Sequence, residues 1–251
     1  MMPALAFRDV TKSFLDGLRE VAVLDGVSFE LYAGETVGVL ASRGAGKTTL
    51  LRVAAGLEAP DAGEVRWQGR DLAGLGAGER ARVRRRGGIA LACGDWRAGG
   101  SMAVLEHVAM PLYSEGLSME RAEACARRAL ELVQAPGLGH LATGRLGLAE
   151  RLRVELARAI VREPALLLVD EPAVLPQASD AQSFYSLVHS LPGRLGLSLL
   201  IASEEVSALR GAGRIMNLDG GRMYSTDSRR KVISLPERRG RHGRGMGADA
   251  S

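Results

Sequence analysis

A short glycine-containing segment carries the residues best suited to hold phosphate groups. The sequence TVGVLASRGAGKTTLLRVAAGL predicts an apolar strand over residues 36–40, a turn, and an apolar helix that begins near Lys47. Gly44 and Gly46 let backbone N–H groups converge on phosphate oxygens, and the helix N-terminus adds its dipole. The Lys47 ammonium can bridge outer phosphates, and the Thr48 hydroxyl can bind Mg²⁺. The segment therefore predicts a nucleotide-binding loop in preference to an ordinary helix cap.

One position departs from the pattern G-x-x-x-x-G-K-[ST], which places a glycine where this chain has Ala41. If the backbone at Ala41 has a positive φ angle, the methyl group costs roughly 1–2 kcal/mol, which strains the loop without abolishing it. The two glycines nearest the phosphates are retained. The residues of this loop that we expect to contact a nucleotide are Ala41, Ser42, Arg43, Gly44, Ala45, Gly46, Lys47, Thr48 and Thr49.

Two carboxylates follow a second apolar segment, ALLLVDEP, at residues 165–172. Its continuous apolarity is typical of a parallel strand buried on both faces. Asp170, at the carboxyl end of this strand, can hold Mg²⁺ through water, and Glu171 can polarise an attacking water as a general base. Taken alone, the two acids also fit a solvated strand end. The phosphate loop upstream favours an ATP site with Mg²⁺.

Length, charge and cysteine content limit the class of protein. A chain of 251 residues can bury a sizeable core in one large domain or two small ones. No apolar run approaches the about 18–20 residues of a membrane span. Arg8 and Asp9 stand where a signal peptide would be apolar, so we expect an intracellular protein. The only cysteines, Cys93 and Cys125, lack metal-type spacing and are expected to be free thiols.

The net charge of +4 is not expected to come from a basic face of the folded protein. Its positive excess lies in the glycine- and arginine-rich segment that starts at Arg229, and we expect residues 226–251 to be a disordered basic tail. The tail is expected to act as a solubilising extension, with contact to acidic lipids or RNA as the alternative. No specific nucleic-acid partner is predicted.

Over about residues 5–224 the chain resembles the ATP-binding-cassette (ABC) ATPases. The matching segments are FRDVTKSF, VLDGVSFELYAGE, the phosphate loop, GLEAPDAGEVRWQGRDL, MAVLEHVAMPL, RVELARAIVREPALLLVDEP and RIMNLDGGRM. Phe14 stands where the family usually has a tyrosine that stacks on adenine, and a core phenylalanine is the alternative reading of that residue. The insertion DGLREVA is most similar to the subfamily of lipoprotein release, macrolide efflux and peptide-sensing export.

This resemblance implies an α/β fold. It implies a P-loop (RecA-like) core from residues 1–92 and 163–225, an N-terminal antiparallel β region, and an inserted α-helical subdomain over about residues 93–162. It also implies a dimer in which each ATP lies between one chain's phosphate loop and the other chain's signature motif, LSGGQ or LSGGE.

Several motifs of the family are altered in this chain. Its signature position reads Leu146, Gly147, Leu148, Ala149 and Glu150, which removes the serine hydroxyl and replaces a glycine by Leu148. Other motif positions that lack the family's residue are Gly94 for a glutamine, Gln177 for an aspartate and Ser203 for a histidine. Each loss is expected to cost on the order of 10²–10³ in rate, and the effects overlap. The chain alone should be a poor ATPase.

We therefore expect the ATP-binding subunit of an ABC transporter, peripheral at the cytoplasmic face of the membrane, with a permease on a separate chain. Export is the expected direction, and a different, more intact cassette is the expected partner. One alternative is a nucleotide-gated scaffold without turnover. A soluble family member acting on ribosomes or DNA is disfavoured, because the chain has one cassette and no heptad run.

Overall fold

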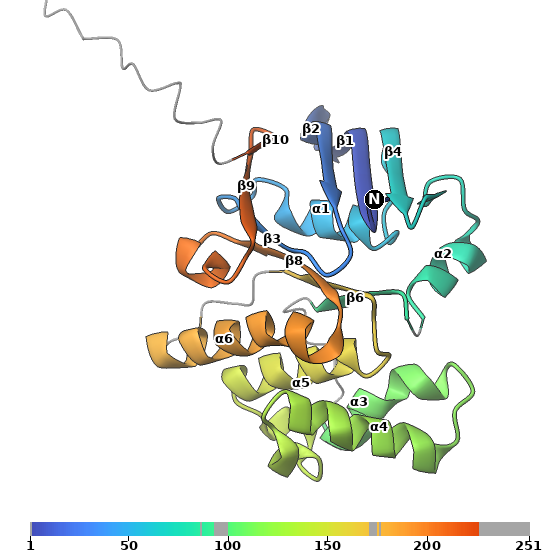
Figure 1. Ribbon diagram of the computed structural model, residues 1–251, viewed down its shortest axis with the longest axis vertical. Helices are drawn as coiled ribbons and strands as arrows, with labels where there is room; N and C mark the ends of the chain where they lie inside the picture. Colours follow the sequence, from blue (N-terminus) through green and yellow to red (C-terminus); the bar gives the residue numbers. More distant parts are fainter. Residues whose placement is uncertain (1, 86, 93–99, 171–174, 176, 226–251) are drawn as a thin grey trace, which may run out of the picture.

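The computed structural model describes residues 2–85, 87–92, 100–170, 175 and 177–225. Two sheets and the helices around them make up this part of the chain (Figure 1). The predictions made for Cys93, Gly94, Glu171 and segment 226–251 lie outside the described residues.

The N-terminal part of the chain forms an antiparallel sheet in the order β2-β1-β4-β5. Its strands are β1 (Leu5–Asp16), β2 (Arg19–Leu31), β4 (Ala62–Trp67) and β5 (Arg70–Asp71). Phe7 and Phe29 stand opposite each other in the β1–β2 register, and their rings stack with centroids 4.8 Å apart. This cross-strand pair anchors the buried face of the sheet.

The second sheet has the order β10-β9-β3-β8-β7-β6. Its strands are β3 (Thr36–Leu40), β6 (Ile89–Ala92), β7 (Leu166–Val169), β8 (Ser198–Ser203), β9 (Arg214–Asp219) and β10 (Arg222–Ser225). All pair in parallel except β10, which runs antiparallel to β9 at the edge. The carboxyl ends of β3, β8, β7 and β6 therefore lie along one edge of the sheet.

Six α-helices accompany these strands among the described residues. They are α1 (Lys47–Ala54), α2 (Ala77–Val83), α3 (Val104–Tyr113), α4 (Met119–Leu132), α5 (Leu148–Ile160) and α6 (Ala178–Leu195). Within the described part of the chain, no helix combines the length and the apolarity that a membrane span needs.

Helix α1 lies between the two sheets, and α5 and α6 cover the opposite face of the parallel sheet (Figure 1). Alternate residues of β7 follow this division. Leu166 and Leu168 belong to the same core cluster as Leu50 of α1, whereas Leu167 and Val169 pack in the cluster that contains α5 and α6. The strand is apolar throughout because both of its faces are buried.

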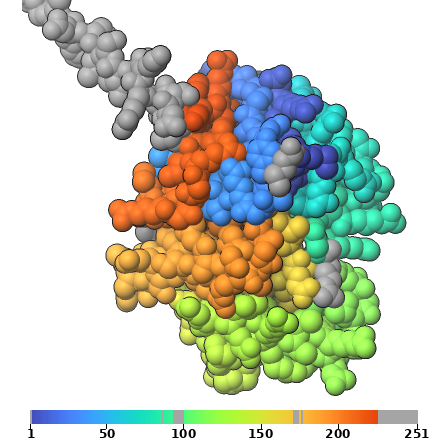
Figure 2. Space-filling model, in the orientation of Figure 1, coloured from blue at the N-terminus to red at the C-terminus, as the bar shows by residue number. Residues whose placement is uncertain are grey.

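Helices α3, α4 and α5 come between β6 and β7 in the chain and gather at one end of the molecule (Figures 1 and 2). Leu152, Leu156 and Ile160 recur at four-residue intervals on α5 and are buried. This spacing gives the helix one apolar side, which packs against its neighbours. The residue bounds of the predicted helical subdomain, about 93–162, stay a prediction.

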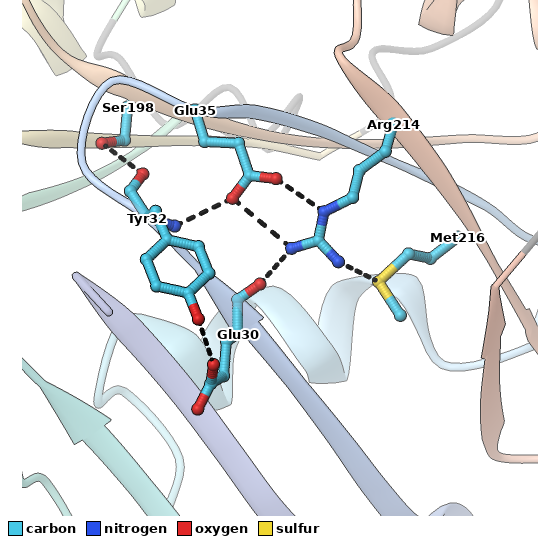
Figure 3. Close-up of polar contacts among 6 residues, drawn as sticks. All are labelled: Glu30, Tyr32, Glu35, Ser198, Arg214 and Met216. Carbon is cyan, nitrogen blue, oxygen red and sulfur yellow. Dashed lines mark hydrogen bonds and ion pairs between the residues drawn. The ribbon is translucent and has the colours of Figure 1, made fainter. Parts of the chain in front are cut away.

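A polar cluster fixes the start of β3 beside β9 (Figure 3). The Arg214 guanidinium of β9 donates to Glu35 Oε1 at 2.6 Å and also to the Glu30 carbonyl oxygen. The Tyr32 N–H donates to Glu35 Oε2 at 2.8 Å, and the Tyr32 hydroxyl donates to the Glu30 carboxylate, which raises the pKa of Tyr32. Because β3 leads directly into the predicted phosphate loop, this cluster helps to position the site.

Candidate nucleotide-binding site

The predicted phosphate loop occupies the turn between the end of β3 at Leu40 and the start of α1 at Lys47. Gly44 and Gly46 have φ angles of 78° and 101°, in the left-handed region that favours glycine. A Cβ atom on Gly46 would lie 2.9 Å from both the Val23 carbonyl oxygen and Val23 Cγ1. Gly46 is therefore required both by its backbone conformation and by the close approach of β2.

Ala41 does not carry the strain that a positive φ angle would cause. The described residues other than glycine with positive φ are Asp9, Gln68, Gln134 and Glu163, and Ala41 is not among them. Its N–H donates to the Ser203 carbonyl oxygen at 3.0 Å, and the residue is 5% exposed. Alanine in place of the first glycine of the motif therefore causes no left-handed backbone strain in the loop.

Lys47, the first residue of α1, points its ammonium group back into the loop. Its Nζ atom lies 3.1 Å from the Ala41 carbonyl oxygen, 3.1 Å from the Ser42 carbonyl oxygen and 3.1 Å from Glu204 Oε1. The side chain is 9% exposed. A buried ammonium at the start of this helix, directed into the loop, is well placed to meet a phosphate.

The two predicted Mg²⁺ ligands meet across 122 positions of sequence. The Thr48 hydroxyl in the first turn of α1 donates to Asp170 Oδ2 at 2.6 Å. Asp170 directly follows β7, and its N–H donates to the Ala92 carbonyl oxygen of β6 at 2.9 Å. A hydroxyl and a carboxylate oxygen at this distance fit the oxygen ligation that Mg²⁺ prefers. Thr48 and Asp170 are therefore the residues that would hold the ion.

Phe14 lies on β1, opposite Val21 of β2, and is 42% exposed. The alternative of a core phenylalanine is therefore wrong. The Lys12 ammonium lies 5.4 Å from the centre of the Phe14 ring and is held by Asp61 Oδ1 at 2.7 Å. The exposed ring is compatible with stacking on a base, which stays a prediction.

The altered signature segment begins α5. The Gly147 N–H donates to Glu150 Oε2 at 2.8 Å, so the helix start is capped by its own carboxylate. Leu148, the first residue of the helix, is 36% exposed, whereas Leu146 is buried. The neighbouring Ala149 is half-buried. Leu148 and Glu150 thus occupy this helix start, where the family's signature motif has a glycine and a glutamine or glutamate.

Ser203 ends β8 in register with Leu40 of β3 and is fully buried. Its Oγ atom accepts a hydrogen bond from the Glu205 N–H at 3.0 Å, so the hydroxyl takes part in the turn after the strand. The next residue, Glu204, carries the side chain that reaches Lys47. Gln177 lies just before α6 and is exposed.

Glu204 is the site residue that the sequence reasoning missed. Like Asp170, it directly follows an apolar parallel strand, and it lies at the edge where the phosphate loop also begins. Glu204 and Glu205 form a pair of acids after a strand, the same pattern that points to Asp170 and Glu171.

This fold and this site define a nucleotide-binding domain of the P-loop class, with its candidate site residues at the carboxyl edge of a parallel sheet. Residues 24–174 match the model of the ABC transporter family. The chain belongs to this family and is an ATP-binding subunit similar to those of the lipoprotein-release type. The predicted family and the predicted fold are thereby confirmed.

Individual relatives show the extent of the similarity. The chain is 35% identical to the lipoprotein-releasing system ATP-binding protein LolD of Chromohalobacter salexigens over 214 residues, which cover 85% of this chain and 90% of LolD. It is 34% identical to the methionine import ATP-binding protein MetN of Rhizobium johnstonii, covering 86% of this chain and 59% of MetN.

A solved structure supports the same fold. A dimeric post-hydrolysis state of the ATP-binding cassette MJ0796, bound to ADP and Pi, matches with a TM-score of 0.80 at 22% identity. The match covers 88% of this chain and 98% of that cassette.

Proposed function

We propose that this ATP-binding subunit couples ATP binding and slow hydrolysis to a separate membrane permease, in the direction of export. The observation that carries the proposal is the convergence of Lys47, Thr48 and Asp170 at one edge of the sheet. The export direction is supported by the segment at residues 16–22 and by the relative named for lipoprotein release. The relative named for methionine import makes import the alternative.

In this proposal each residue of the site has a separate task. Lys47 and the N–H groups of the loop bind the outer phosphates, and Phe14 stacks on adenine. Thr48 and Asp170 hold Mg²⁺, which neutralises phosphate charge when it is bound. Glu171 orients the attacking water as a general base. The site would lie at the cytoplasmic face of the membrane, with the subunit held there by the permease.

The second part of the proposal is that this chain pairs with a different, more intact cassette. In a pair of identical chains, both ATP sites would face Leu148 and the self-capped start of α5. Both would also lack the family's glutamine and histidine, whose positions are occupied by Gly94 and Ser203. A different partner would supply an intact signature to the site built on Lys47, and its own loop to the other site. One site would then mainly hold ATP and the other would turn over slowly.

A nucleotide-gated scaffold without turnover is the second candidate function. It is favoured by the self-capped start of α5, where the Gly147 N–H donates to the Glu150 carboxylate. Release of inorganic phosphate by the purified complex separates the two. Slow release of phosphate by the wild-type complex supports the transporter subunit. Tight ATP binding without phosphate release supports the scaffold.

Purification of the native complex and mass analysis of its subunits test the partners. A permease and a second cassette of different sequence support the proposal. Two copies of this chain, no other cassette and brisk hydrolysis that Glu171→Gln removes would overturn the asymmetric pair. Recovery of ribosomes or DNA in place of a permease would overturn the transport function.

The ATP site itself is tested by Lys47→Ala, which should weaken Mg-ATP affinity strongly because the phosphates lose a point charge. Arg52→Ala is the matched control. It removes one positive charge from the last turn of the same helix, where Arg52 pairs with Glu58 at 3.2 Å. Equal ATP affinity in the wild-type chain and both variants would contradict the assignment of the loop.

A further inference from the structure

The ammonium group that should meet a phosphate is already engaged by a carboxylate of the same chain. An ammonium has three N–H donors. Lys47 Nζ lies 3.1 Å from each of two loop carbonyl oxygens, of Ala41 and Ser42, and 3.1 Å from Glu204 Oε1. These acceptors already occupy the donors of the ammonium, so an arriving phosphate oxygen must take the place of an existing partner.

Of these three acceptors, Glu204 is the one that is able to leave. The carbonyls of Ala41 and Ser42 belong to the backbone of the loop, and Ala41 is tied to β8 through its N–H. The Glu204 side chain is 41% exposed, whereas that of Lys47 is 9% exposed. A rotation of the Glu204 side chain into solvent frees one donor without moving the backbone of the loop.

The fold fixes the backbone that carries this carboxylate. Strand β8 pairs in parallel with β3, and Ser203 stands opposite Leu40. The Ala41 N–H donates to the Ser203 carbonyl oxygen at 3.0 Å, and the Glu205 N–H donates to Ser203 Oγ at 3.0 Å. Glu204 is thus held between two anchored residues, directly beside the loop.

We propose that the Glu204 carboxylate is a displaceable internal ligand of the Lys47 ammonium. In the nucleotide-free protein this carboxylate takes the place of a phosphate oxygen, and it competes with the outer phosphates of ATP. The inference rests on the proposed ATP site. It adds a residue that sets nucleotide affinity and favours ligands with enough negative charge to displace a carboxylate. Triphosphates and diphosphates can displace the carboxylate. A monophosphate cannot, because its phosphate does not reach Lys47.

The test is the affinity of the purified full-length chain for Mg-ATP, tripolyphosphate and AMP, measured by isothermal titration calorimetry. Glu204→Gln should bind Mg-ATP and tripolyphosphate roughly threefold to tenfold more tightly than wild type, the effect of losing a partly exposed ion pair with a buried ammonium. Its AMP affinity should not change by the same factor, because Lys47 reaches the outer phosphates.

Glu205→Gln is the matched control. It removes the same charge from the adjacent position, where the carboxylate accepts from the Ser207 hydroxyl at 3.0 Å. A general effect of charge on an anionic ligand would be similar in both variants, whereas the proposed competition is confined to Glu204. Glu204→Asp provides a second variant, which keeps the charge, shortens the side chain by one methylene and should raise affinity by less.

Failure of this inference and failure of the proposed ATP site give different results. Tighter polyphosphate binding by Glu204→Gln than by Glu205→Gln, with AMP affinity unchanged, supports the inference. Equal affinities in these two variants, an equal gain for AMP, or weaker ATP binding in Glu204→Gln overturns it. Failure of every variant and of wild type to bind ATP contradicts the proposed ATP site itself, and the inference with it.

Discussion

Restoring the missing glycine of the phosphate loop should destabilise this protein. The motif alone suggests that Ala41→Gly repairs a defect, because many such loops have a glycine at this place. In the structure Ala41 has no left-handed backbone and is 5% exposed. Its methyl group is therefore compatible with the native conformation and contributes to packing.

The expected magnitude follows from two effects. Replacing alanine by glycine where alanine fits enlarges the conformational freedom of the unfolded chain, which costs about 0.4–1 kcal/mol. Loss of a buried methyl group costs about 0.8 kcal/mol more. Together they predict that the free energy of unfolding falls by about 1–2 kcal/mol. Mg-ATP affinity should change little, since Lys47 and both positive-φ glycines of the loop are untouched.

The assay is equilibrium unfolding in urea, with the slope of the transition compared between wild type and variant so that a shift of the midpoint reports stability. Gly44→Ala is the control. Gly44 has a φ angle of 78° and open space where a Cβ would lie, so this variant should lose only the roughly 1–2 kcal/mol of left-handed alanine. A more stable Ala41→Gly would refute the argument, because it would mean that Ala41 is strained.

Three further outcomes are expected. Gly46→Ala should lower the free energy of unfolding by more than Gly44→Ala in the same urea assay. The new Cβ at position 46 would lie 2.9 Å from a backbone oxygen, in addition to the left-handed strain. Equal losses of unfolding free energy in the two variants would contradict the close approach. Phe14→Ala should weaken ATP binding by about 1–3 kcal/mol, the usual loss when an aromatic ring no longer stacks on a base, and Phe14→Tyr should retain it; calorimetry that finds no change would exclude the stacking. The hydrogen bond from Lys12 lowers the pKa of the Asp61 carboxyl. A lowered folded-state pKa gives stabilisation that is present above the ordinary carboxyl pKa of about 3.9 and is lost as pH falls through the folded value. Asp61→Asn should therefore lower the thermal midpoint at about pH 7 and have a smaller effect at about pH 2, and a difference that grows in acid would reverse the sign of the argument.

The strand, loop and helix around the phosphate site were predictable because each is encoded locally. Residues 36–40 were expected as a strand and form β3, and α1 begins at Lys47 as expected. Continuous apolarity identified β7 as a buried parallel strand. Patterns of this kind arise from burial on one or both faces of an element and need no knowledge of its neighbours.

The family resemblance supplied what local patterns do not contain. It related segments that are far apart in the chain, and it predicted the antiparallel N-terminal region together with the P-loop core. The altered positions at Leu148 and Ser203 also became visible only by comparison with the family's motifs. Their consequences for turnover stay predictions.

Residue type, spacing and periodicity thus indicated the phosphate loop and the residues suited to Mg²⁺, and the family resemblance supplied the fold class. The tertiary structure decided three properties that depend on distant chain segments. The φ angle at Ala41 is set where β3 meets β8, the need for glycine at Gly46 is set by Val23 of β2, and the contact of Glu204 with Lys47 spans 157 positions. Parallel pairing brings these residues to one sheet edge, and no local pattern records which side chains then meet.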